Sequence, residues 1–159
     1  MPTTLTEGQP APAFELDNDR GERVKLGDLR GQWVVLYWYP KDDTPGCTTE
    51  ACDIRDNWQM LSGEAALFGV SPDNVQSHVK FRDKFSLPFP LLADDEHKVS
   101  DQYGVWGPKK FAGHDYMGVD RATFIIDPEG NLAKVFPKVS PAGHALEIST
   151  ALKELKAQR

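Results

Sequence analysis

The chain has 159 residues and a mass of 17.7 kDa, which fits one domain over residues 1–159 and leaves little room for a second. Hydrophobic residues make up 40% of the chain and charged residues 26%, a balance that favours a folded globule and excludes a disordered chain. Eighteen Lys and Arg residues against 24 Asp and Glu residues give a net charge of −6, so we expect no nucleic-acid partner.

No segment of the sequence has the length and hydrophobicity of a transmembrane helix. The longest apolar run covers residues 33–39, whereas a helix needs about 20 residues to span a bilayer. Residues 1–14 contain neither a basic cluster nor an apolar stretch of signal-peptide length. We therefore expect a cytoplasmic protein with no membrane partner.

Strand-like and helix-like segments alternate along the chain, which predicts an α/β fold. Residues 14–16 and 24–26 flank a polar segment and predict a short N-terminal β-hairpin. Residues 33–39 and 65–70 are continuous apolar runs, as in strands that are buried on both faces. We expect the first of these runs near the centre of the sheet.

The middle of the chain predicts a helix and then a loop. Apolar side chains at helical spacing indicate a helix over residues 75–85, which the prolines of residues 87–90 end. Residues 104–118 contain four glycines and one proline and predict a long loop, a kind of segment that is often functional.

The last third predicts two strands and a helix. Residues 122–126 and 131–136 are strand-like and are joined by a turn at 127–130, which indicates a hairpin and hence a mixed sheet. Residues 145–155 have helical spacing, and residues 140–141 (Ser-Pro) predict the N-cap and first position of that helix. Together the segments predict a central mixed β-sheet flanked by α-helices.

The first cysteine follows the strand that we expect at the centre of the sheet. Thr44 and Pro45 predict the N-cap and first residue of a helix, which puts Cys47 in its first turn. Unpaired backbone N–H groups and the helix dipole favour a thiolate there. A nearby cation would add to this effect, and Arg121, which opens a buried strand, is the candidate. Cys47 is therefore the predicted nucleophile.

Cys52 lies five residues further on and predicts a second step. On an ideal helix the two Cα atoms would be about 8.7 Å apart, whereas a disulfide requires less than about 7 Å. A bond between Cys47 and Cys52 would therefore require at least one helical turn to unwind. The four histidines are scattered singly and do not form the paired spacing of a zinc site. We predict neither a metal nor a cofactor.

Two segments of the sequence resemble the peroxiredoxin signature. The first has the pattern P-x-x-x-T-x-x-C with a glutamate three residues later, and the second is an arginine ahead of a Thr-Phe-Ile-Ile-Asp strand. The matching residues are Pro40, Thr44, Cys47, Glu50 and Arg121. The position of Cys52 is similar to that in the bacterioferritin-comigratory-protein subgroup, also called the Q group. The likeness covers almost the whole chain, from residues 8–14 to the final helix.

This resemblance implies a thioredoxin-like fold and a thiol-dependent peroxidase that reduces hydrogen peroxide and organic hydroperoxides. Cys47 would be the peroxidatic cysteine, which becomes a sulfenic acid. Cys52 would be the resolving cysteine, which forms an intramolecular disulfide with Cys47. Thioredoxin or a similar dithiol protein would then reduce that disulfide. Members of the subgroup are often monomers, so a monomer is implied.

The resemblance also implies roles for the other matching residues. Thr44 and Arg121 would hold the peroxide oxygens and the thiolate by hydrogen bonds, and Pro40 would shield the thiolate. Glu50 would orient Arg121 through an ion pair. Ala122 departs from the pattern, because many relatives have a hydroxyl residue there.

Other interpretations of the same residues stay open. Cys47 could be a buried inert thiol, and Arg121 could be a surface charge at the end of a strand. A thiol–disulfide exchanger normally uses the spacing C-x-x-C, which the longer interval here disfavours. A non-catalytic redox sensor that signals through the same helix unwinding is the other alternative.

Overall fold

The protein, described over residues 3–159 by a computed structural model, is built on one seven-stranded sheet in the order β2-β1-β5-β4-β3-β8-β9. Its strands are β1 (Glu15–Asn18), β2 (Arg23–Lys25), β3 (Val34–Trp38), β4 (Ala66–Ser71), β5 (Leu91–Ala93), β8 (Ala122–Ile126) and β9 (Leu132–Phe136). β3 is parallel to β4 and antiparallel to β8. The predictions of a mixed sheet and of an N-terminal hairpin, β1–β2, are confirmed.

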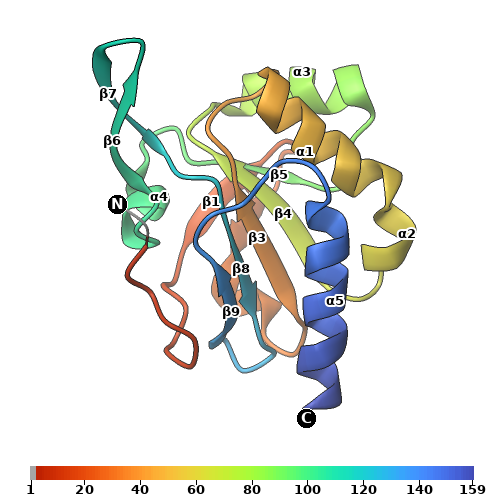
Figure 1. Cartoon of the computed structure of the whole chain (residues 1–159). Helices are drawn as coiled ribbons and strands as arrows, with labels where there is room; N and C mark the ends of the chain where they lie inside the picture. The colour runs from red at the N-terminus through yellow and green to blue at the C-terminus, as the bar shows by residue number, and fades with distance from the viewer. Residues whose placement is uncertain (1–2) are drawn as a thin grey trace.

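The helices lie in the segments between the strands, and the last helix follows the final strand. They are the 3-10 helix η1 (Leu26–Leu29) and the α-helices α1 (Pro45–Asp56), α2 (Trp58–Leu61), α3 (Val75–Phe85), α4 (Lys98–Gln102) and α5 (His144–Ala157). Figure 1 shows α1, α2, α3 and α5 on one side of the sheet, with α4 on the other side. Among the described residues, no helix has both the length and the apolar character needed to cross a membrane.

β3 is buried along its whole length because both faces of the sheet are covered. Its side chains alternate between the faces, as strand geometry requires. Val35 and Tyr37 pack in a core cluster with residues of α1, α2, α3 and α5. Leu36 and Trp38 pack in a second cluster on the other face. The continuous apolar run in the sequence is therefore an interior strand, as predicted.

The prediction of a loop over residues 104–118 is wrong. This segment forms a two-stranded hairpin of β6 (Trp106–Phe111) and β7 (His114–Val119). Ala112 and Gly113 form its turn, both with positive φ, which is the backbone of a tight hairpin turn. Ala-Gly is a weaker turn signal than Asn-Gly, and most side chains of the two strands are exposed, so the buried–exposed alternation is weak. The hairpin projects beyond the seven-stranded sheet (Figure 1).

The predicted start of the last helix is also wrong. α5 begins at His144, and its N-cap is Gly143 rather than a residue of 140–141. The backbone N–H of Ala145 donates to the carboxylate of Asp53 in α1, at 2.9 Å. A side chain from another helix thus binds the free N–H group that a local cap would bind. Nothing in the local sequence could indicate this.

Candidate active site

The pairing of β3 with β8 brings Arg121 next to the loop that carries the first cysteine. β3 ends at Trp38, which lies opposite Ala122, the first residue of β8. Arg121 comes directly before β8 and therefore lies beside the chain that leaves β3 toward α1. Its carbonyl oxygen accepts a hydrogen bond from the N–H of Val139 at 3.0 Å. The backbone of Arg121 is thus held by this bond and by the pairing of the next residue with β3.

Helix α1 positions Cys47 and Glu50 on one buried face. Thr44 is the N-cap residue and Pro45 the first helical residue, as predicted. Cys47 lies in the first turn with an exposed fraction of 2%, and Glu50, three residues later, is fully buried. Residues three apart on a helix are neighbours on its surface. One side chain from outside the helix can therefore reach both.

The predicted capping bond of Thr44 is not formed. Its hydroxyl donates to the carbonyl oxygen of Lys41 at 2.8 Å instead of accepting from a helix N–H group. The backbone carbonyl of Thr44 accepts the hydrogen bond of Thr48 N–H at 2.8 Å. Thr44 therefore begins the helix through its backbone, while its side chain stabilises the preceding loop.

The guanidinium of Arg121 bridges Cys47 and Glu50 of α1. Nη2 donates to the Cys47 sulfur at 3.5 Å, and Nη1 donates to Glu50 Oε1 at 2.7 Å. A Cβ at Gly46 would lie 3.1 Å from Nη2, so the missing side chain leaves room for the guanidinium. The structure thus brings together Cys47, Glu50 and Arg121, which are predicted site residues. Gly46 was not among them, and only its place next to a cysteine could have indicated it.

Burial and charge act in opposite directions on Glu50. Burial raises the pKa of this carboxyl to about 7, and the positive charge of Arg121 opposes that rise. Burial alone would lower the pKa of Arg121, but Cys47 and Glu50 hold it above its usual value. The second oxygen of Glu50 and the hydroxyl of Tyr37 are buried, with no hydrogen-bond partner among residues 3–159. Burial also raises the pKa of Tyr37 well above its usual range, so this phenol stays neutral.

Cys52 lies on the same unbroken helix as Cys47. Both are free thiols, and Cys52 is partly buried. Because α1 runs from Pro45 to Asp56, both cysteines are held at helical separation, beyond the reach of a disulfide. An intramolecular bond thus requires α1 to unwind between them.

Pro40 and Arg121 line a cavity of about 710 Å³ at this edge of the sheet. The hairpin forms much of its opposite wall, with the apolar side chains of Trp106, Met117 and Val119. The volume lies in the range of sites for small organic molecules. Of the residues that match the signature, Pro40 and Arg121 thus line the cavity, and Cys47 and Glu50 contact Arg121. The sequence pointed to residues 104–118 as a segment of a kind that is often functional, but it indicated a loop there and none of these residues as part of the site.

One group of side chains offers the residue types of a metal site. The carboxylates of Asp42 and Asp73 and the imidazole of His78 lie within 4.8 Å of one another. The oxygens concerned already accept hydrogen bonds: Asp42 from Ser77, and Asp73 from Ser71. These bonds account for the arrangement without a metal ion.

Comparisons with known proteins agree with this geometry. A protein-family model described as the AhpC/TSA family matches residues 7–135. The chain belongs to the AhpC/TSA family. Within it, the chain is 50% identical to peroxiredoxin Bcp of Bacillus subtilis over 153 residues, which are 96% of this chain and 98% of that protein. It is 41% identical to peroxiredoxin Bcp of Escherichia coli K12 over 151 residues, covering 94% and 97%. This AhpC/TSA protein is a peroxiredoxin of the Bcp or Q type.

Solved structures support the same assignment for this peroxiredoxin. Bacterioferritin comigratory protein of Xanthomonas campestris, whose structures are described in terms of alkyl peroxide reduction, superposes with a TM-score of 0.85. It is 34% identical, and the match covers 94% of this chain and 98% of that one. The predicted thioredoxin-like peroxiredoxin fold and thiol peroxidase class are confirmed.

Proposed function

We propose that Cys47 is the residue of this peroxiredoxin that attacks the peroxide, and that Arg121 assists it. The observation that carries this is the single guanidinium that contacts both the Cys47 sulfur and Glu50. A positive charge at 3.5 Å from sulfur favours the thiolate, which is the nucleophile. The same donor can bind a peroxide oxygen as negative charge develops on it. Glu50 fixes the orientation of Arg121 by accepting the hydrogen bond of Nη1 at 2.7 Å.

The proposed reaction has two steps at the cysteines, and a dithiol reductant then returns both cysteines to thiols. The thiolate of Cys47 attacks the terminal oxygen of ROOH, so that the S–O bond forms and the O–O bond breaks. The leaving RO⁻ takes a proton and departs as the alcohol ROH, and Cys47 is left as sulfenic acid. After α1 unwinds, the Cys52 thiolate attacks the sulfenic sulfur, so that the S–S bond forms and the S–O bond breaks, and the leaving hydroxide takes a proton from solvent and departs as water. A dithiol protein such as thioredoxin then reduces the disulfide and is itself oxidised.

We propose alkyl hydroperoxides as substrates in addition to hydrogen peroxide. The cavity at Pro40 and Arg121, about 710 Å³, far exceeds the space that hydrogen peroxide needs. Its apolar wall, which includes Trp106 and Met117, can bury an alkyl group. We further propose a cytoplasmic monomer that takes electrons from thioredoxin.

Steady-state turnover tests this function. With thioredoxin, its reductase and NADPH, wild-type protein should consume peroxide over many cycles, and Cys47→Ser should abolish consumption. Cys52→Ser should retain one fast oxidation of Cys47 but lose recycling by thioredoxin. A protein that oxidises once and shows no steady consumption would instead be the redox sensor. Reduction of insulin disulfides in the absence of peroxide would identify an exchanger.

A further inference from the structure

A buried polar cluster lies under the loop that connects β3 to α1, away from the Cys47 sulfur. The loop residue Asp42 pairs with His78 of α3: Asp42 Oδ2 and His78 Nδ1 are 2.7 Å apart. The side chains have exposed fractions of 3% and 0%. Tyr39 donates to Asp42 Oδ1 at 2.6 Å, and Ser77 donates to Oδ2 at 2.8 Å. None of these residues belongs to the peroxiredoxin signature described above.

The hydrogen bonds of His78 define where its protons are. Nε2 lies 2.9 Å from the carbonyl oxygen of Leu92, which can only accept. Nε2 therefore carries a proton. Nδ1 faces a carboxylate oxygen at 2.7 Å, and two lone pairs would repel at that distance. One further proton must lie between Asp42 and His78, on the nitrogen or on the oxygen.

The surrounding groups favour this proton. Asp73, in the loop between β4 and α3, places its carboxylate close to the pair and accepts from the Asp42 N–H at 2.8 Å and from the Ser71 hydroxyl at 2.6 Å. Tyr39, which comes directly after β3, faces the pair as a neutral phenol, because burial and the Asp42 charge raise its pKa well above the usual range. β5 contributes only the Leu92 carbonyl.

No basic side chain of residues 3–159 offsets these groups. The ion pair of Lys84 with Asp43, on the solvent side of the loop, is exposed. Apart from His78, the titratable groups facing Asp42 are thus Asp73 and Tyr39, and no lysine or arginine faces it within the described residues.

The loop depends on this cluster for its shape. Asp43 has φ of +57°, a conformation that costs free energy for a residue other than glycine and needs support from its surroundings. The loop also carries Pro40 and Thr44 on either side of Asp42. A connection between Asp42 and α3 therefore determines where both of these residues lie relative to Cys47.

We propose that Asp42 and His78 are positioning residues: joined by one shared proton, they hold the loop that carries Pro40 and Thr44 in the form that reacts with peroxide. The proposal rests on the function proposed above. Loss of the shared proton leaves two lone pairs facing each other and weakens the link between the loop and α3, because Ser77 is then the one residue of α3 that still donates to Asp42. The loop is in its active form when the Asp42–His78 pair holds the proton. The reaction of Cys47 should therefore slow as the pH rises and the pair loses this proton.

Asp42→Asn is the decisive variant. The Asn amide can donate to the unprotonated Nδ1 of His78 and still accept from Tyr39, so the contact no longer needs the shared proton. The single-turnover rate constant of Cys47 with peroxide, followed by tryptophan fluorescence, should fall by about tenfold per pH unit on the alkaline side in wild type. In Asp42→Asn it should change by less than about threefold over the same range. Lys84→Met, which removes only the exposed ion pair to Asp43, should keep the wild-type profile.

The outcomes separate this proposal from the proposed function. A wild-type protein that does not react with peroxide at any pH contradicts the function itself. An alkaline fall that persists unchanged in Asp42→Asn overturns the positioning pair alone, because this variant has no shared proton to lose. A rate that is lower by the same factor at every pH, with the alkaline fall unchanged, is the result of a purely structural role. If Asp42→Asn does not fold, nitrogen NMR of ¹⁵N-histidine-labelled wild type decides. Its His78 ring should lose one proton in parallel with the rate, and a ring that does not titrate with the rate overturns the proposal.

Discussion

The guanidinium of Arg121 holds two acidic side chains inside the protein. It lies 2.7 Å from Glu50 and 3.5 Å from the Cys47 sulfur. With all three groups ionised, the buried trio would carry a net charge of −1, which desolvation disfavours. Ionisation of Cys47 therefore favours a proton on Glu50. The buried second oxygen of Glu50, which has no hydrogen-bond partner in the described part of the chain, is the atom on which that proton can lie.

Glu50 should make stability depend on pH. Its pKa is about 7 in the folded protein, above the ordinary value of 4.5, so between these values the folded state binds more protons than the unfolded chain. Its contribution is fully present below pH 4.5 and is lost as pH rises through about 7. The loss is on the order of 3 kcal/mol. Urea unfolding of the reduced protein at pH 5 and pH 7.5 should show this fall, and Glu50→Gln should remove most of it. An equal fall in the variant would contradict the assignment.

Gly46 should matter because of the space beside it. Alanine there would place Cβ 3.1 Å from Arg121 Nη2 and push the guanidinium away from sulfur. Gly46→Ala should lower the rate constant of Cys47 oxidation by about tenfold, since small misplacements of catalytic groups are costly. Thermal unfolding should show an unchanged or higher Tm, because alanine favours the helix. Gly27→Ala, where no atom lies within 4 Å of the added Cβ, is the matched control and should keep the wild-type rate.

At the scale of elements, α1 must be stable in one step and unwind in the next. Its first turn holds Cys47 beside Arg121, and its continuation through Cys52 keeps the two sulfurs apart. A hydrogen bond ties the end of this segment to the neighbouring helix: Asp53 accepts from Ala145 N–H at the start of α5. The strength of this tie therefore helps to determine how often α1 opens.

Breaking the tie should speed up disulfide formation. Asp53→Ala removes an acceptor from a helix N-terminus, a loss of about 1 kcal/mol, so the unwound form should be populated about fivefold more. After one equivalent of peroxide, the disulfide should form correspondingly faster by quenched mass spectrometry. Amide hydrogen exchange of residues 46–53 should also rise in the reduced variant. Asp56→Ala, an exposed change on the same helix, is the control; equal rates in both variants would argue against the tie.

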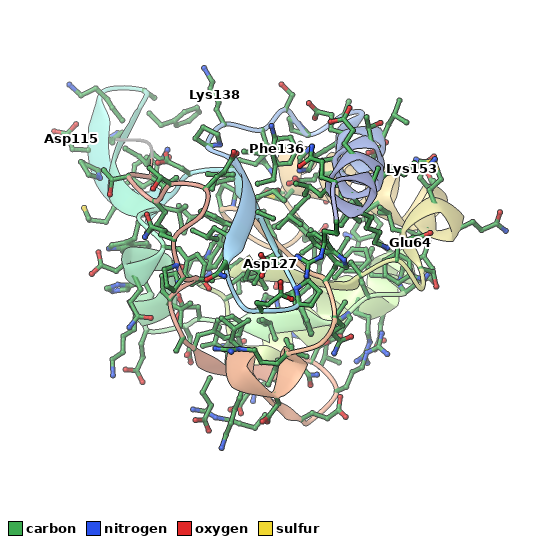
Figure 2. All side chains as sticks on the ribbon, turned by 90° about the horizontal axis from the view of Figure 1, so that it is seen from below. Glu64, Asp115, Asp127, Phe136, Lys138 and Lys153 are labelled. Atoms are coloured by element: carbon green, nitrogen blue, oxygen red, sulfur yellow. The ribbon has the colours of Figure 1, made fainter. Side chains whose placement is uncertain are left out.

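At the scale of the whole molecule, the site is assembled from segments that are distant in the chain. Antiparallel pairing of β8 with β3 brings Arg121 to a helix more than 60 residues earlier. The β6–β7 hairpin then forms a wall of the cavity with Met117 and Val119. Figure 2 shows Asp115 at the outer end of this hairpin, far from Glu64 and Lys153 beside α5. The apolar wall thus comes from the base of an element whose tip points away from the core.

The sequence by itself determined the features that depend on neighbouring residues. Thr44 and Pro45 favour a helix start through local preferences that do not depend on the rest of the fold. A helix that begins there has Cys47 in its first turn and holds Cys52 too far from Cys47 for a disulfide. Apolar runs were sufficient to find β3, β4 and β8, because burial on both faces leaves a continuous pattern. The resemblance then indicated Arg121 and Glu50 as a pair.

Tertiary structure alone decided the features that depend on contacts between distant residues. The hairpin of residues 106–119 has a weak local pattern, because most of its side chains are exposed. α5 starts where Asp53 binds its first turn, not where the sequence offers a cap. The Asp42–His78 pair joins residues 36 positions apart, and no local sequence pattern links the two. Hydrogen bonds and ion pairs depend on distance in space, and that distance is fixed only when the sheet has ordered its strands.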